Sequence, residues 1–107
     1  VKIAKRNVKK AGLEKRIEVV QGDALEVIPR LAGKLDFVFI DAEKSQYLDY
    51  LRLAEPKKSK NCVVVADNVK IFKHTMGDYL NHVRNGKNYK SKTYDFGFDA
   101  VEVSVKK

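Results

Sequence analysis

Acidic side chains follow two apolar stretches of the sequence at the point where each stretch ends. Residues 35–40 (LDFVFI) run into Asp41, and residues 62–66 (CVVVA) run into Asp67 and Asn68. The carboxyl ends of parallel strands meet at one edge of an open α/β sheet, where ligands bind. If the two strands are neighbours, these side chains lie within about one strand spacing, ~4.8 Å. Their oxygen atoms suit Mg²⁺, Mn²⁺ or Ca²⁺ rather than Zn²⁺.

A structural role is the alternative for each aspartate, since an acid at a strand end often caps the next helix or shapes a turn. Lys44 follows Asp41 by three positions. Beside a bound cation and partly removed from water, Lys44 would have a lowered pKa and could take a proton from a substrate hydroxyl. The metal would hold the resulting oxyanion. Alternatively, Lys44 is an ordinary surface cation among 22 Lys and Arg residues.

Further candidate residues are expected on the same ligand-binding side. Asp23 and Ala24 follow a strand predicted at 17–20, and Asp23 would bond a cofactor's base, cap the next helix, or do both. Glu43 would contact the same ligand or face water. The two histidines have no partner at metal-binding spacing and are expected on a helix surface. Neither the GxxxxGK[ST] nor the GxGxxG phosphate-binding motif is present.

The elements that must position these residues alternate between helices and strands. From hydrophobic periodicity and turn residues, we predict a helix at 2–11, a short helix capped by Asp23, a helix that starts at Ser45 and is ended by Pro56, and a helix at about 75–85. We predict strands at 17–20, 35–40, 62–66, 89–96 and 100–106. This order is typical of a doubly wound α/β sheet that ends in an antiparallel hairpin. Strand 35–40 is apolar on both faces, so we expect helices to cover both.

Length, charge and cysteine content limit the class of protein. The 107 residues are enough for a single domain, 1–107, with its own core. The net charge of +8 favours an anionic partner such as RNA, with a solvated lysine-rich surface as the alternative. Cys62 lies in an apolar run, which indicates a buried thiol in a reducing, cytoplasmic setting. No stretch approaches the roughly 20 apolar residues of a membrane helix.

The stretches RIEVVQGDALEVIPRL, LDFVFIDAEKSQYLDYL and VVVADNV resemble the cation-dependent O-methyltransferase family. This family includes catechol and caffeoyl-CoA O-methyltransferases and relatives that methylate tRNA uridine hydroxyls. The resemblance implies a Rossmann-like class I methyltransferase fold, S-adenosylmethionine as cofactor and a divalent cation, Mg²⁺ before Mn²⁺ or Ca²⁺. Carried over by motif, the metal ligands would be Asp41, Asp67 and Asn68, the catalytic residues Lys44 and Asp41, and the cofactor contacts Gly22, Asp23, Ala24, Asp41 and Glu43.

The resemblance also implies what residues 1–107 lack. The family's fold opens with a strand, a glycine-rich loop and a second strand that ends in an acid for the ribose. The chain therefore resembles the C-terminal half of that fold, and we expect weak or absent cofactor binding by the isolated chain. Strands 17–20 and 35–40 would flank the missing pair, and their open apolar edges favour self-association or pairing with an N-terminal half.

Three functions are consistent with these features. The first is half of a metal-dependent O-methyltransferase that acts on a small-molecule hydroxyl. The second is a tRNA hydroxyuridine-type methyltransferase or a basic RNA-binding module. The third is an inactive remnant that acts through protein association. Phe72 stands where plant members of the family carry a polar substrate contact, which counts against a caffeoyl-CoA-type acceptor.

Overall fold

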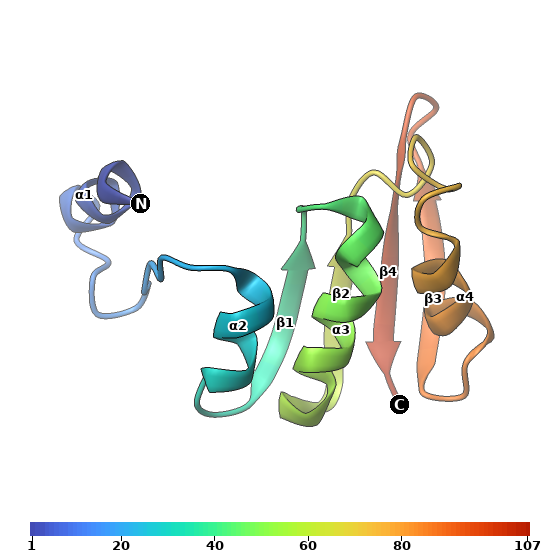
Figure 1. Ribbon diagram of the computed structural model, residues 1–107, viewed down its shortest axis with the longest axis horizontal. Helices are drawn as coiled ribbons and strands as arrows, with labels where there is room; N and C mark the ends of the chain where they lie inside the picture. Colours follow the sequence, from blue (N-terminus) through green and yellow to red (C-terminus); the bar gives the residue numbers. More distant parts are fainter.

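The computed structural model describes residues 1–107 and contains one four-stranded sheet with helices against one face (Figure 1). The elements are α1 (Lys2–Lys10), α2 (Ala24–Val27), β1 (Leu35–Ile40), α3 (Tyr47–Ala54), β2 (Lys58–Ala66), α4 (Gly77–Asn85), β3 (Tyr89–Asp95) and β4 (Ala100–Lys106). The strand order is β1-β2-β4-β3. Only β1 and β2 are parallel, and β3 and β4 form the closing antiparallel hairpin. The predicted α/β architecture is thus confirmed.

The pairing of β1 with β2 sets the geometry of the candidate site. Ile40 lies opposite Ala66 in the parallel register. The backbone N–H of Asp67 donates to the carbonyl of Ile40 at 3.1 Å, so the contact continues past the end of both strands. Because side chains alternate between the faces of a sheet, this register also buries Ile40 and Ala66 on the same side.

The hydrophobic core lies between the sheet and the layer formed by α3 and α4. Helical spacing leaves two alternatives for the inward side of α3, which are Leu48, Leu51 and Ala54 or Tyr47, Tyr50 and Ala54, and both sets are buried. The inward positions that spacing predicts for α4 are also buried: Met76, Tyr79, Leu80 and Val83. The rings of Tyr47 and Tyr79 meet edge to face, with centroids 5.7 Å apart, an arrangement that aromatic quadrupoles favour. Cys62 is a buried free thiol, as predicted.

Hydrogen bonds define two helix ends, at Gly12, where the glycine and the following Leu13 predict a C-cap, and at Asp23, the predicted cap of the next helix. After α1, Gly12 has φ +71° and its N–H donates to the carbonyl of Lys9, while the N–H of Leu13 donates to Val8. These two hydrogen bonds form a Schellman motif. The motif favours glycine at this position because glycine lacks a Cβ atom. Asp23 caps α2 by accepting a 3.0 Å hydrogen bond from the N–H of Leu25.

Other boundaries differ from the prediction. Strand β2 begins at Lys58 rather than at residue 62, since Lys58 pairs with Leu35 across an irregular register. Asn61 has φ +66° within this stretch, a conformation typical of a bulge. The sequence also predicts Thr75 as the cap of α4, with Asp78 three residues on, but the N-cap is Met76 and has no side-chain capping bond.

The predicted strand at 17–20 is wrong, because these residues pair with no other strand. Helix α1 and the segment after it stand apart from the sheet (Figure 1), and no residue of α1 is buried. A strand forms only where a neighbour supplies hydrogen-bond partners. Ile17 and Val20 are consequently 45% and 47% exposed.

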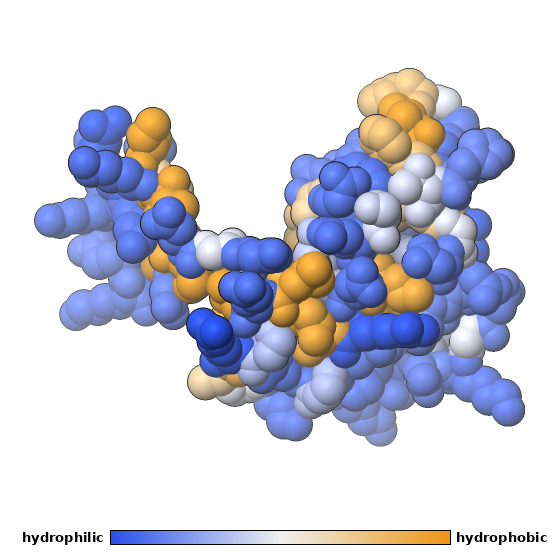
Figure 2. Space-filling model, viewed as in Figure 1, coloured by the Kyte–Doolittle hydropathy of each residue, from blue (hydrophilic) through white to orange (hydrophobic).

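The prediction that strand 35–40 is covered on both faces is also wrong. Phe37 and Phe39 of β1 are 60% and 55% exposed, because the helices cover only the opposite face. An almost wholly apolar groove lies along β1 and is also lined by Ala24 of α2 and by Tyr50 and Ala54 of α3. On the helix side, Figure 2 shows apolar side chains at the surface between α2 and α3 and on the α1 segment. The expected association of the chain stays a prediction, and the free edge of β1 is where it would occur.

None of the helices has the length and apolar character that a membrane crossing requires. The cytoplasmic location and the single-domain assignment stay predictions.

A buried carboxylate ties α4 to the terminal hairpin. Glu102 of β4 is fully buried and accepts hydrogen bonds from Arg84 at 3.0 and 3.1 Å, from Ser91 at 2.6 Å and from Thr93. Burial by itself raises the pKa of Glu102. The hydrogen bonds, of which those from Arg84 are the strongest, outweigh this effect and hold the pKa below its ordinary value.

We predict that Glu102→Gln makes the free energy of unfolding depend less steeply on pH in the acidic range. Since the folded-state pKa of Glu102 is lowered, its contribution is complete above about pH 4.5, the ordinary glutamate value, and is lost as the pH falls further. At pH 7 the variant should lose about 1–3 kcal/mol of unfolding free energy. Urea unfolding at pH 3–7 measures both effects. The exposed Glu18→Gln is the control, and an unchanged acid slope in Glu102→Gln would contradict the assignment.

Candidate functional site

The carboxyl edge of β1 and β2 brings the predicted residues together. Asp41 leaves β1 and Asp67 leaves β2, one position beyond the paired residues Ile40 and Ala66. Ala24, at the start of α2, lines the same groove as Asp41. Of the predicted cofactor contacts, Ala24 therefore borders this edge from the α2 side.

The remaining predicted cofactor contacts are exposed. Gly22 has φ +148°, and a Cβ atom added to it would come within 2.9 Å of Val27, so the position favours glycine. The carboxylate of Asp23 is engaged in the α2 cap. Glu43 accepts a 3.3 Å hydrogen bond from the Ser45 hydroxyl. These residues flank the groove, and their contact with a cofactor stays a prediction.

Lys44 is held at the centre of the site by three oxygen atoms. Its Nζ donates to Asp41 Oδ1 at 3.2 Å, to the carbonyl of Ala42 at 3.0 Å and to the Tyr47 hydroxyl at 3.0 Å. The aromatic rings of Tyr47 and Phe72 lie 5.1 and 5.6 Å from Nζ, within cation–π range. The Lys44 side chain is 14% exposed, whereas the Asp41 side chain is 51% exposed.

The pKa of Lys44 is raised above its ordinary value. Desolvation pushes it down, but the hydrogen bonds with Tyr47 and then Asp41 outweigh that effect. The sequence predicted a lowered pKa beside a bound cation, and the site's own hydrogen bonds act in the opposite direction. Lys44 is therefore an ammonium ion at neutral pH in this structure.

Tyr47 is a site residue that the sequence assigned only to the core. It is fully buried, and its hydroxyl accepts from Lys44 and donates to the carbonyl of Asp67 at 3.2 Å. One side chain of α3 thus links the loops that follow both strands. Its spacing of three from Lys44 and its polar tip at an inward position are the signals that could have revealed this role.

Asn68 is fixed in one orientation by its neighbours. Its backbone has φ +64°, in the left-handed region that asparagine tolerates. Its N–H donates to Asp67 Oδ1 at 2.8 Å, and its Nδ2 donates to Asp99 Oδ2 at 2.7 Å. The amide oxygen makes no hydrogen bond, so it remains available as a ligand atom.

The three predicted ligands fit a hard divalent cation in type, as two carboxylates and one free amide oxygen. No group of three or more His, Cys, Asp and Glu side chains is placed to hold a metal ion anywhere in the chain. A cation at this edge would therefore depend on Asn68 as well as the two aspartates. His82 is not an ordinary surface residue, since its Nε2 lies 3.0 Å from Glu55 Oε2, away from this edge. His74 is exposed.

Comparison with known proteins identifies the family. The model of an O-methyltransferase family matches residues 1–91. The chain belongs to this O-methyltransferase family. It is 43% identical over 68 residues to a catechol O-methyltransferase from Mycobacterium tuberculosis, which covers 63% of the chain and 31% of the relative. It is 42% identical over 89 residues to the catechol O-methyltransferase of Sus scrofa, which covers 77% of the chain and 47% of the relative.

Solved structures of O-methyltransferases share the fold. The Bacillus cereus enzyme in complex with SAH superposes with a TM-score of 0.87 at 22% identity, covering 99% of the chain and 57% of that protein. TomG from Streptomyces achromogenes, in complex with SAM, gives 0.85 at 20% identity, covering 96% and 55%. The fold is therefore Rossmann-like and of class I methyltransferase type, and the chain spans about half the length of these proteins.

We predict that Tyr47→Phe weakens the link between the two loops. Loss of the hydroxyl removes one hydrogen bond from Lys44 and one to the carbonyl of Asp67, and should lower the unfolding free energy by about 1–2 kcal/mol. The matched control is Tyr50→Phe, which removes a single bond to Gln46 and should cost less. Urea unfolding of both variants measures the difference. Equal stability of Tyr47→Phe and wild type would contradict the link.

Proposed function

We propose that this chain supplies the catalytic edge of an S-adenosylmethionine-dependent, divalent-metal-dependent O-methyltransferase that methylates a hydroxyl group of a small molecule. The observation that carries the proposal is the convergence of Asp41, Lys44, Asp67 and Asn68 where two parallel strands end. Membership of the O-methyltransferase family supports the reaction class. The complexes of structural neighbours with SAH and SAM support the cofactor.

Each residue has a role in this proposal. Asp41, Asp67 and the amide oxygen of Asn68 would hold the cation, whose charge favours the ionised form of a nearby acceptor hydroxyl. Lys44 keeps its proton in the structure. Its 3.2 Å hydrogen bond to Asp41 Oδ1 supports a role in orienting that carboxylate, and its ammonium group would place positive charge beside the acceptor oxygen. Its action as a base stays a prediction.

The acceptor and cofactor would approach this edge from different sides. The Phe72 ring lies 5.6 Å from Lys44 Nζ and is 40% exposed, so it offers a flat apolar wall that suits an aromatic acceptor. Ala24 shares the β1 groove with Asp41. This shared lining supports a cofactor on the α2 side, contacted by Gly22, Asp23 and Glu43. In-line attack on the methyl group would then depend mainly on positioning.

A chimeric enzyme tests the proposal. Residues 1–107 would replace the matching portion of the Mycobacterium tuberculosis relative, and transfer of the methyl group from S-adenosylmethionine to catechol would be measured with Mg²⁺ and with EDTA. We expect Mg²⁺-dependent transfer. Asp41→Ala and Asp67→Ala should each lower kcat/KM about 100-fold or more, since each removes a carboxylate ligand. Asp49→Ala, at an exposed position of α3, should have little effect. Metal-stimulated activity that survives both site substitutions would contradict the proposal.

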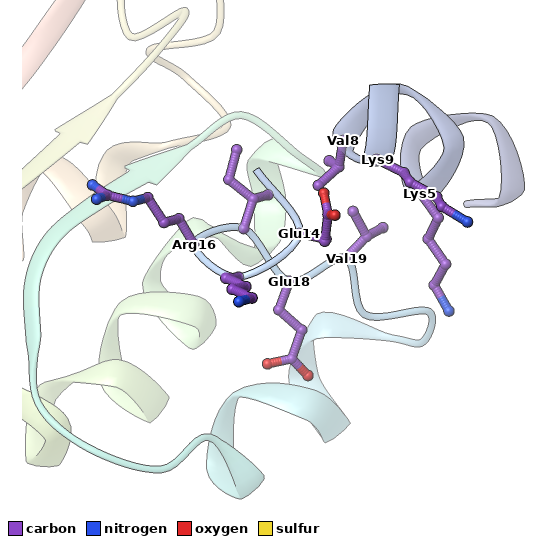
Figure 3. A pocket seen from close by; sticks show the side chains of 9 residues that line it. Lys5, Val8, Lys9, Glu14, Arg16, Glu18 and Val19 are labelled. Atoms are coloured by element: carbon purple, nitrogen blue, oxygen red, sulfur yellow. The ribbon is translucent and has the colours of Figure 1, made fainter. Parts of the chain in front are cut away.

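Methylation or binding of RNA is the second candidate, favoured by the net charge of +8. The α1 segment adds a specific feature, an open hollow between α1 and the segment that follows it. Four basic side chains line it, namely Lys5, Lys9, Lys15 and Arg16, together with the acids Glu14 and Glu18 (Figure 3). Clustered lysine and arginine side chains are suited to phosphate groups.

RNA binding of this kind predicts a steep dependence on salt. If phosphate contacts dominate, the affinity of the chain for tRNA should fall linearly on logarithmic axes as salt rises. Lys9→Gln with Arg16→Gln should reduce the magnitude of that slope by about 2, one for each lost phosphate contact. Filter binding at several salt concentrations measures it, with the exposed Lys107→Gln as control. Binding that ignores salt would exclude this candidate.

A further inference from the structure

Asp99 lies immediately before β4 and contacts the loop that follows β2. It is only 6% exposed. Its Oδ2 accepts the 2.7 Å hydrogen bond from Asn68 Nδ2. Its Oδ1 accepts backbone hydrogen bonds from Ala100 at 2.8 Å, Ile71 at 3.2 Å and Lys70 at 3.3 Å. The two carboxylate oxygens therefore have different partners. Oδ1 accepts hydrogen bonds from the backbone, and Oδ2 accepts one from the Asn68 side chain.

The hydrogen bonds around Asp99 determine which end of the Asn68 amide faces it. Both of its side-chain oxygens accept, Oδ1 from three backbone N–H groups and Oδ2 from Asn68 Nδ2. A carboxylate only accepts hydrogen bonds, so the amide must present its nitrogen to Asp99. The amide oxygen then points away from Asp99.

We propose that Asp99 is a positioning residue that selects the amide orientation of Asn68 and so presents the Asn68 oxygen to a divalent cation. The inference rests on the metal-binding part of the proposed function. Asp99 does not itself act as a ligand. Without it, the amide can rotate by half a turn and present a nitrogen that carries two hydrogens and cannot bind a cation.

An exchange of the two side chains separates this role from support of the loop backbone. Asp99→Asn retains an oxygen for the backbone N–H groups but places an NH₂ group opposite that of Asn68. Asn68→Asp then restores a donor–acceptor pair of reversed polarity and leaves one carboxylate oxygen for the cation. The charge added by Asn68→Asp is the same in both backgrounds, so a double-mutant cycle isolates the interaction between positions 68 and 99.

Mn²⁺ binding to the 107-residue chain is the measurement, with free Mn²⁺ followed by electron paramagnetic resonance. We expect Asp99→Asn to weaken binding about 10- to 100-fold, the effect typical of residues that orient metal ligands. Asn68→Asp should improve binding at least about 10-fold more in the Asp99→Asn background than in wild type. Unfolding midpoints of all four proteins show whether the fold is retained.

Each remaining outcome has a distinct meaning. Wild-type affinity in Asp99→Asn, or an equal effect of Asn68→Asp in both backgrounds, overturns the positioning role while the metal site stands. A wild-type chain that takes no Mn²⁺ overturns the metal site and this inference with it.

A measurement on the wild-type chain covers the case in which Asp99→Asn fails to fold. The Asn68 side-chain amide should exchange with solvent more slowly than that of the exposed Asn7, as followed by nuclear magnetic resonance. Equal exchange rates for the two amides would also overturn the proposal.

Discussion

The parallel register of β1 and β2 is the constraint on which the candidate site depends. It places Ile40 opposite Ala66, so the two aspartates that follow emerge side by side. A slip of one residue would turn every side chain of one strand to the opposite face of the sheet. Ile40 and Ala66 are both buried against the helices, and the loss of that burial opposes such a slip. Packing of the core thereby fixes the position of polar groups at the edge.

The terminal hairpin supports the site from the other side. Strand β4 pairs with β2. This pairing brings Asp99, which precedes β4, next to the loop that holds Asn68. The ion pair between buried Glu102 and the 41% exposed Arg84 joins α4 to the same hairpin. A buried charge that loses its partner costs about 3–5 kcal/mol. Polar groups of the core therefore act together with apolar packing in holding the loop that carries two of the proposed ligands.

Much of this structure was predictable from local patterns. Helical spacing placed Tyr79 and Val83 in the core and left two alternative inward sets for α3, and strand-end acids identified the edge. The patterns could not reveal the roles of Asp99 and the Tyr47 hydroxyl, because both depend on contacts between residues 20 or 31 positions apart. The raised pKa of Lys44 likewise follows from the arrangement of its three partners.

The errors have a common physical origin. Apolar character predicted a strand at 17–20 and coverage of both faces of β1. A strand also needs a neighbouring strand, and a covered sheet face needs a helix packed on it, and apolar character provides neither. The chain spans about half the length of the solved relatives, and within these residues no strand pairs with the free edge of β1. Ile17 and Val20 are exposed because they pair with no strand, and Phe37 and Phe39 are exposed because no helix covers their face of the sheet.

The central claim is that the ends of β1 and β2 form one cation site within this chain. The most direct measurement is a titration of the isotope-labelled chain with substoichiometric Mn²⁺, followed by backbone amide signals. Paramagnetic broadening should be strongest at residues 41–44 and 67–70 and should appear in both segments at the same metal concentration. Broadening spread over unrelated exposed acids such as Glu14 and Asp49, or confined to one of the two segments, would contradict the account.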